Sequence, residues 1–281
     1  MTAPKYDLVL FGATSFVGKI VAHYLMNEYR LDDEIKWAAA GRSKEKLEIL
    51  KQELGPEAAK LDLIVVDASD EVTLLEICQT TRVMVSTVGP YALYGETLVK
   101  VCAESGTDYC DLTGEVQWVR KMISLYEAQA QASGARIVHC CGFDSIPSDL
   151  GVFYLQAQAR VHLGSYCCRV KMRVHRMKGE FSGGTVASLM NVVKEASKDP
   201  ALRKELANPY SLCPQDHPFS ARQPLVNAPQ NDRDFNSWVA PFVMAAVNTR
   251  VVHRSNALAG AAYSDEFLYD EGVTTGPGLA G

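Results

Sequence analysis

The first thirty residues constrain the fold more than any other part of this 281-residue chain. Lys5–Phe11 is an aliphatic and β-branched run typical of a buried strand, and a turn between Gly12 and Gly18 follows it. From Phe16 to about Tyr29, apolar residues recur at helical spacing. A strand that turns tightly into a helix directs the unpaired N–H groups and the positive end of the helix dipole to one point, which favours a phosphate there.

The glycine positions make this turn a candidate dinucleotide-binding loop. Gly12 permits the tight turn, and Gly18 permits close packing of the helix on the sheet. Ser15 stands where such loops carry a central glycine, so we expect it to fit without a positive φ and to place its hydroxyl or N–H on a phosphate. The predicted contacts are Gly12, Thr14, Ser15, Phe16, Val17 and Gly18. The alternative is an ordinary strand–turn–helix joint.

The end of the second predicted strand, Ile35–Ala40, discriminates between cofactors. NAD enzymes usually carry an acidic residue there for the ribose hydroxyls, whereas this chain has Arg42 and Ser43. An arginine donates two hydrogen bonds to a 2′-phosphate and stacks on adenine, so we predict NADP(H) as the cofactor. The alternative is that Ser43 only caps the helix Lys44–Leu54 and that Arg42 is solvated.

Further strands and helices alternate along the next hundred residues. The strands are predicted at Leu61–Val66, Arg82–Thr87, Tyr109–Leu112 and Arg136–Cys141, and the helices between them at Glu71–Thr80, Glu96–Ser105 and Val116–Ser133. This alternation predicts an α/β fold with a Rossmann-type doubly wound parallel sheet. In the usual strand order of such a sheet, a crevice lies where the carboxyl ends of the first and fourth strands meet.

Two strand ends carry further candidate cofactor contacts. Asp67 follows the third strand, where its carboxylate can accept a hydrogen bond from the adenine amine, and the alternative is an N-cap for the next helix. Val88, Gly89 and Pro90 follow the fourth strand, so we expect them beside the nicotinamide, although a plain turn explains them too.

From Gly142 on, the sequence becomes rich in turn-forming residues. A turn-rich stretch over residues 142–149 precedes a helix that runs to about Ala159. We therefore predict an NADP-binding Rossmann domain over residues 1–145 and a mixed α/β substrate or dimerisation domain over residues 146–281.

The second domain contains one clear strand. Ser165–Met177 alternates basic and apolar residues, which predicts an antiparallel strand with a solvated basic face, and the alternative is that this face attracts an anionic substrate. We expect a helix over Val186–Ser197 and a long loop over Asn208–Asn236. The run from Gly272 to Gly281 does not look like the end of a packed domain. We therefore expect either further residues beyond it or a second chain that completes the sheet.

Composition excludes several classes of protein. The formal net charge of −5 and the absence of a basic run interleaved with aromatic residues argue against a nucleic-acid binder. The chain enters a strand almost at once and has no apolar run long enough to span a bilayer, so we expect a soluble cytoplasmic protein without a signal peptide. The eight cysteines include two vicinal pairs but no metal-binding motif, which predicts reduced thiols and no metal site.

Motifs along nearly the whole chain carry a family resemblance. They are Gly12–Gly18, Ala40–Arg42, Val88–Tyr91, Tyr94–Glu96, Asp111–Glu115, Gly142–Asp149, Gly183–Thr185, Trp238–Met244 and Arg250–Arg254. In this order they resemble the saccharopine dehydrogenase-like family, and most closely its trans-acting enoyl reductases. The resemblance implies an NADP-binding Rossmann domain followed by a mixed α/β substrate domain, in a protein usually longer than this one. Ser15 departs from the family's central glycine.

The resemblance also implies an activity. Mycobacterial members of the family are implicated in the reduction of enoyl groups on polyketide-derived lipids, and animal relatives are associated with lipid surfaces. The implied function is an NADP(H)-dependent oxidoreductase that acts on a lipid-like small molecule, in the cytoplasm or at the periphery of a membrane or lipid surface. The alternatives are a saccharopine-type amino-acid dehydrogenase and a non-catalytic NADP-binding scaffold at a lipid surface. We also expect a homodimer.

Reduction of an activated C=C bond needs a proton donor and a group that stabilises charge on the adjacent carbonyl oxygen. The candidates near the predicted crevice are Tyr91, Tyr94, Glu115, Asp144 and Ser145. Of these we select Tyr94 and Asp144, with a structural hinge at Asp144 and Ser145 as the alternative. The chain contains no Tyr-x-x-x-Lys pair, the proton donor of short-chain dehydrogenases.

Overall fold

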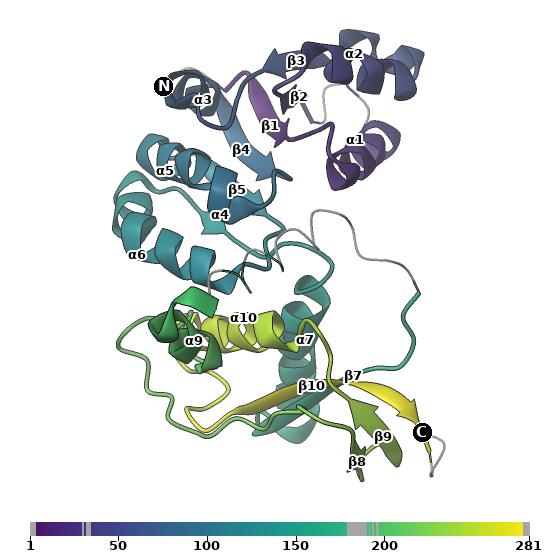
Figure 1. Ribbon diagram of the computed structural model, residues 1–281, viewed down its shortest axis with the longest axis vertical. Helices are drawn as coiled ribbons and strands as arrows, with labels where there is room; N and C mark the ends of the chain where they lie inside the picture. The colour runs from purple at the N-terminus through teal and green to yellow at the C-terminus, as the bar shows by residue number, and fades with distance from the viewer. Residues whose placement is uncertain are drawn as a thin grey trace. The chain divides into compact units, whose positions relative to one another are not determined.

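The computed structural model describes residues 4–29, 31, 35–178, 190, 192, 194 and 197–277. The chain forms two compact units, and the main division between them falls between Cys141 and Gly142. Figure 1 labels the helices and strands of both units. The domain boundary after residue 145 stays a prediction. The expected helix Val186–Ser197 and the motif Gly183–Thr185 lie largely outside the described residues.

The first unit is built on a parallel sheet. Its strands are β1 (Tyr6–Phe11), β2 (Trp37–Gly41), β3 (Asp62–Val65), β4 (Thr81–Ser86), β5 (Asp108–Asp111) and β6 (Ile137–Val138). Their order is β3-β2-β1-β4-β5-β6, and every neighbouring pair is parallel. This is the doubly wound order, so the predicted fold class is confirmed. The sixth strand is shorter than predicted, and the backbone two residues beyond it is no longer extended, since Cys140 has a φ of 61°.

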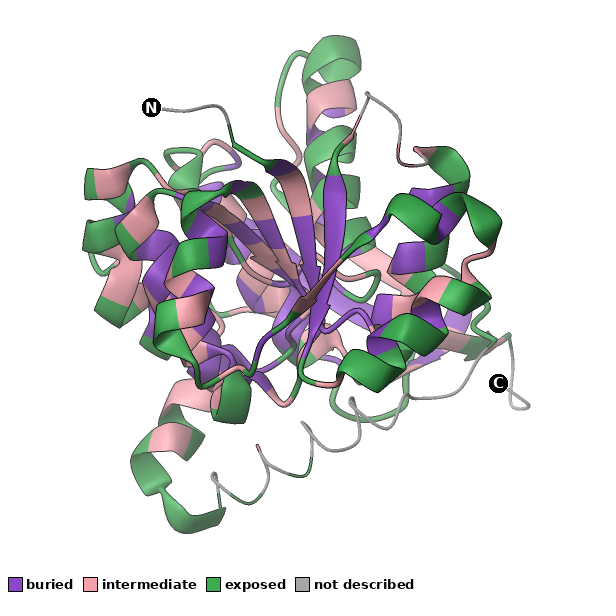
Figure 2. Cartoon of the chain, turned by 90° about the horizontal axis from the view of Figure 1, so that it is seen from above, coloured by how far each residue is buried: buried purple, intermediate pink, exposed green. Residues whose placement is uncertain are grey.

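Helices connect these strands. They are α1 (Phe16–Glu28), α2 (Lys44–Glu53), the 3₁₀ helix η1 (Pro56–Lys60), α3 (Glu71–Gln79), α4 (Tyr91–Tyr94), α5 (Glu96–Ser105) and α6 (Val116–Ser133). Their inner faces pack on the sheet through residues such as Leu25, Leu47 and Leu50, which are almost fully buried. Figure 2 shows buried residues along the strands and on the inner faces of the helices, while the outer faces are exposed.

The second unit contains a mixed sheet. Its elements are α7 (Ile146–Leu163), β7 (Arg169–Val174), α9 (Pro200–Ala207), β8 (Gln230–Asp232), β9 (Ser237–Ala240), α10 (Ala245–Leu258) and β10 (Leu268–Gly276). The strand order is β7-β10-β9-β8. Val152 of α7 and Val252 of α10 pack with Val170, Tyr269 and Phe267 to form the core on one face of this sheet. The predicted mixed α/β character is confirmed.

Three predictions for this unit were wrong in whole or in part. β7 is not antiparallel but pairs in parallel with β10, which the long connection through β8, β9 and α10 permits. The basic face of β7 is solvated only in part, since the Arg173 side chain is 3% exposed and lies against Asp232 and Asp270, whereas the Arg169 side chain is 46% exposed. The second unit has more than the one clear strand predicted, because Gly272–Gly276 belong to β10, a central strand of a four-stranded sheet.

The long loop predicted over Asn208–Asn236 is largely irregular, but it is not a solvated linker. It contributes β8 to the sheet, and Tyr210 and Leu212 are buried. Gln223 accepts a hydrogen bond from the N–H of Tyr269 at 3.0 Å, which ties the loop to β10. All eight cysteines are free thiols. Within the described ranges, none of the helices combines the length and the apolarity that a membrane span requires.

The ion pairs of β7 give the second unit an acid-sensitive stability. Desolvation alone would raise the pKa of Asp232, but hydrogen bonds from Lys171 and Arg173 outweigh it and lower the pKa from 3.8 to about 2. A carboxyl group whose pKa is lower in the folded state stabilises the fold fully above its unfolded value and loses that effect as the pH falls toward its folded value. We expect the free energy of unfolding to fall by roughly 2 kcal/mol between pH 4 and pH 2 from this group.

Urea unfolding of the wild type and of an Asp232→Asn variant across this pH range tests the expectation. The variant should be less stable at neutral pH and should have a shallower acid slope. Equal slopes for the two proteins would show that Asp232 is not the titrating group.

Candidate functional site

The predicted cofactor contacts lie along one edge of the first sheet. The N–H groups of Gly12 and Ala13 both donate to the carbonyl oxygen of Ala40, at 2.9 and 3.1 Å, and the N–H of Thr87 donates to that of Phe11 at 2.9 Å. These bonds hold the carboxyl ends of β2, β1 and β4 level with one another. The loops brought to this edge are Gly12–Gly18, Gly41–Ser43 and Val88–Pro90, with Asp67 at the end of β3.

Both glycines of the first loop are required by its geometry. Gly12 has a φ of +85°, and a Cβ there would lie 2.6 Å from a methyl group of Val88. A Cβ at Gly18 would overlap the carbonyl oxygen of Gly12 and lie 2.9 Å from the backbone of Ala13. The structural roles predicted for the two glycines, a tight turn and close packing of the helix, are therefore confirmed.

Ser15 closes the loop. Its φ of −70° confirms that it fits without a positive φ, and its Oγ caps α1 by accepting from the N–H of Gly18 at 2.9 Å. The Thr87 hydroxyl donates to the Gly12 carbonyl oxygen at 2.9 Å, so across the 3.0 Å contact Ser15 donates to Thr87. The N–H of Ser15 also donates to Gly12. Both donors of Ser15 are thus used inside the loop.

The first turn of α1 supplies the remaining donors. Helix geometry leaves the N–H groups of Phe16 and Val17 without an acceptor inside the helix, and the dipole adds a partial positive charge at this end. Thr14 lies in the turn just before the cap. An anion at this position would accept from backbone groups alone, which fits a diphosphate and requires no basic side chain in the loop.

Arg42 and Ser43 lie at the end of β2 and differ in their surroundings. Ser43 caps α2 by accepting from the N–H of Lys46 at 3.3 Å, so the capping interpretation of Ser43 is confirmed. Arg42 is exposed at the same edge. Its guanidinium places a cationic group at this edge of the sheet.

Asp67 lies next in order along this edge. Its carboxylate accepts from the hydroxyl and the N–H of Ser69 at 2.6 and 3.0 Å. These hydrogen bonds, with a smaller contribution from the charge of Arg42, lower the pKa of Asp67. The alternative interpretation of Asp67 as a helix cap was wrong, because Asp70 caps α3 by accepting from the N–H of Thr73 at 3.1 Å.

Two of the acid–base candidates are structural groups. Glu115 accepts from the N–H groups of Tyr91 and Ala92 at 2.8 and 3.1 Å. The Tyr91 hydroxyl donates to the carbonyl oxygen of Ser86 at 3.0 Å, and burial raises the pKa of this phenol. Together these bonds hold the segment that follows Pro90 against β4. Tyr94, at the end of α4, is exposed.

A buried carboxylate–imidazole pair was missed in the sequence. Asp111 Oδ2 and His139 Nδ1 are 2.7 Å apart, and Asp111 also accepts from Thr113 and Cys140 backbone N–H groups and from the Tyr109 hydroxyl. Since a carboxylate only accepts, Nδ1 of the imidazole carries the proton. The two residues are 28 positions apart, and only the pairing of Cys110 with Val138 in adjacent strands brings them level.

In the second unit, the turn-rich motif rests on a buried polar network. Ser145 Oγ donates to Asn248 Oδ1 at 2.8 Å, and Asn248 Nδ2 donates to Ser148 and to Glu271 at 3.1 and 3.0 Å. Ser145 is therefore an anchor for the start of α7, which agrees with the hinge interpretation. Asp144 is exposed as a residue, although desolvation of its carboxyl group raises its pKa.

Comparison with known proteins identifies the family. Residues 8–138 match the model of the saccharopine dehydrogenase NADP binding domain. A trans-acting enoyl reductase from Mycobacterium bovis (strain BCG) is 39% identical over 283 residues, which cover 98% of this chain and 67% of that protein. The chain belongs to the saccharopine dehydrogenase-like family, in the branch of the trans-acting enoyl reductases. The family membership predicted from the sequence motifs is thus confirmed.

Other relatives give the extent of the similarity. A Mycobacterium tuberculosis protein is 43% identical over 281 residues, and the chain spans 66% of its length. Among solved structures, apo saccharopine dehydrogenase (L-Glu forming) from Saccharomyces cerevisiae aligns with a TM-score of 0.43 at 19% identity, over 56% of this chain and 32% of that one.

Proposed function

We propose that this protein is an NADP(H)-dependent oxidoreductase that reduces the C=C bond of an enoyl group on a lipid-like thioester. The observation that carries the proposal is the exposed guanidinium of Arg42 on the same sheet edge as the first turn of α1. The names of the relatives support the enoyl substrate. A homodimer is part of the same proposal.

The cofactor contacts follow from the order of the strand ends. The N–H groups of Phe16 and Val17 bind the diphosphate, while Gly12 and Gly18 shape the loop and Thr14 and Ser15 close it. Arg42, beside Ser43, binds the 2′-phosphate. Asp67 lies near adenine, and the nicotinamide contacts come from Val88, Gly89 and Pro90. The bound cofactor supplies the hydride, and the chain orients it.

Protonation of the substrate requires a separate group. Tyr94 and Asp144 remain the candidates from the sequence, and His139 joins them because Asp111 fixes the proton on its Nδ1. An imidazole held in this way is oriented for proton transfer at its other nitrogen. The amino-acid alternative lacks support, since Lys171 and Arg173, its candidate carboxylate binders, are paired with Asp232.

Arg42→Ala should separate the two nicotinamide cofactors. Loss of a charged contact to the 2′-phosphate should weaken NADPH binding at least about tenfold more than NADH binding. Fluorescence titration of both cofactors measures the ratio. Arg82→Ala is the matched control, because Arg82 is an exposed arginine at the start of β4, at the opposite edge of the same sheet. Equal weakening of NADPH and NADH by Arg42→Ala would refute the 2′-phosphate role.

A turnover assay then distinguishes an enzyme from a scaffold. NADPH oxidation is followed with a panel of enoyl thioesters of different chain lengths. We expect oxidation with at least one enoyl thioester and none with the saturated analogue. Tight NADPH binding without oxidation by any member of the panel would favour the non-catalytic scaffold.

A further inference from the structure

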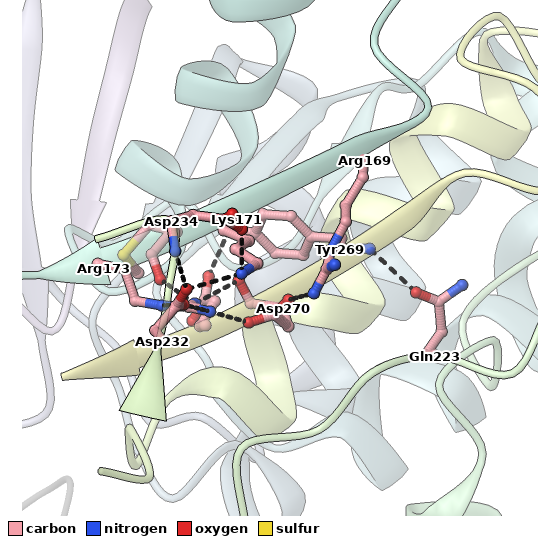
Figure 3. Close-up of polar contacts among 10 residues, drawn as sticks. Arg169, Lys171, Arg173, Gln223, Asp232, Asp234, Tyr269 and Asp270 are labelled. Carbon is pink, nitrogen blue, oxygen red and sulfur yellow. Dashed lines mark hydrogen bonds and ion pairs between the residues drawn. The ribbon is translucent and has the colours of Figure 1, made fainter. Parts of the chain in front are cut away.

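A second candidate site lies on the face of the β7-β10-β9-β8 sheet that points away from α7 and α10. Val170 and Met172 of β7 pack into the core with those helices, so the alternating residues Arg169, Lys171 and Arg173 line the opposite face. A pocket of about 380 Å³ opens there. Figure 3 shows the charged side chains of β7 converging on Asp232 and Asp270.

Two of the cations are fixed in place by carboxylates. Arg173 donates to Asp232 through Nε and Nη2, at 2.9 and 2.7 Å, and its Nη2 lies 2.5 Å from Asp270 Oδ1. Lys171 donates to Asp232 Oδ1 at 2.8 Å and also contacts Asp234. These groups form a rigid floor, and their charges are satisfied within the protein.

Two arginines of the same pocket retain donors. Arg169 has one long contact, 3.5 Å to Asp270 Oδ2, and its side chain is 46% exposed. Arg233 is exposed, and no side chain in the described part of the chain pairs with its guanidinium. The lining holds four cationic side chains against two carboxylates, and Asp234 beside it adds a third, so a positive excess remains.

The rim beside these arginines is apolar. Pro224, Leu225 and Val226 line the pocket, and Leu225 is exposed. Val226 is buried and approaches Gly272 of β10, where an added Cβ would lie 3.5 Å from it. The segment is therefore held against the sheet, which gives the pocket a fixed apolar wall next to its two available guanidinium groups.

We propose that this pocket binds a phosphate monoester that carries a short apolar group. A phosphate monoester presents three terminal oxygens and can accept hydrogen bonds from two arginines at once. A carboxylate has two oxygens, and a single bidentate arginine can pair with both. Arg169 and Arg233 bind the phosphate, and Leu225 covers the apolar group. All of these residues belong to the second unit, so the proposal does not depend on NADP(H) binding.

Calorimetric titration of the whole chain with n-butyl phosphate, inorganic phosphate and butyrate tests the proposal. Butyl phosphate should bind most tightly, and Leu225→Ser should remove its advantage over inorganic phosphate. Binding to vesicles that contain phosphatidic acid is measured as well. If the protein binds both butyl phosphate and these vesicles, its ligand is a lipid headgroup. If it binds butyl phosphate alone, its ligand is a free phosphate ester. Absence of butyl phosphate binding, or tighter binding of butyrate, would overturn the proposal.

Arginine variants locate the binding. Arg233→Ala and Arg169→Ala should each weaken butyl phosphate at least about tenfold, the loss typical of one charge-assisted hydrogen bond. Arg233 is exposed, so its replacement leaves the sheet intact. Arg176→Ala, at an exposed arginine outside the pocket, should leave the affinity unchanged. Equal weakening by this control would show that the phosphate binds elsewhere.

Discussion

Replacement of Arg173 by alanine should lower the free energy of unfolding of the second unit by about 3–5 kcal/mol. The guanidinium lies between Asp232 and Asp270, and all three side chains are only 3% exposed. Removal of the cation leaves Asp232 with Lys171 as its cationic partner and Asp270 with its 3.5 Å contact to Arg169. Two buried carboxylates are then incompletely compensated, and this desolvation is more costly than the loss of the ion pair itself. Urea unfolding followed by circular dichroism measures the change.

Arg169→Ala is the matched control for this experiment. Arg169 comes from the same strand and contacts the same Asp270, but at 3.5 Å and from a side chain that is 46% exposed. Exposed pairs contribute about 1 kcal/mol or less, so this variant should be nearly as stable as the wild type. If Arg173→Ala were equally mild, the buried cluster would not be a determinant of stability.

Gly18→Ala should weaken NADPH binding at least about a hundredfold, the equivalent of roughly 2.7 kcal/mol. The added methyl group would overlap the Gly12 carbonyl oxygen and crowd the backbone of Ala13, so α1 must move away from the loop. Because the helix carries the donor N–H groups of Phe16 and Val17, the shift displaces them from the diphosphate. The same crowding should cost about 1–3 kcal/mol of stability.

Gly151→Ala distinguishes this clash from a general effect of alanine in a helix. Gly151 lies within α7, and an added Cβ there would meet nothing within 4 Å. Since alanine favours helix over glycine, this variant should be slightly more stable and should bind NADPH as the wild type does. Unchanged NADPH affinity in Gly18→Ala would mean that the loop does not hold the cofactor.

Most of the first unit could be predicted because its signals are local. The loop between Gly12 and Gly18, the caps at Ser15 and Ser43 and the alternation of strands with helices all depend on residues close in sequence. The length of the sixth strand was overestimated because the apolar run continues through Cys140, where the backbone is left-handed and no longer extended. A positive φ at a residue other than glycine leaves no clear mark in a single sequence.

The second unit was predicted less well because its contacts are distant in sequence. Arg173 and Asp232 are 59 residues apart, so the alternation in β7 showed which residues share a face but not what covers that face. The pairing of β7 with β10 joins residues about a hundred positions apart, and the glycine and threonines of β10 resemble a loop. The Asp111–His139 pair was missed for the same reason.

A crystal structure of the protein with NADP⁺ tests the central claim most directly. We expect the diphosphate to accept hydrogen bonds from the N–H groups of Phe16 and Val17, and the 2′-phosphate to contact the guanidinium of Arg42. A cofactor bound away from the first turn of α1, or one whose 2′-phosphate faces solvent while Arg42 points elsewhere, would contradict it.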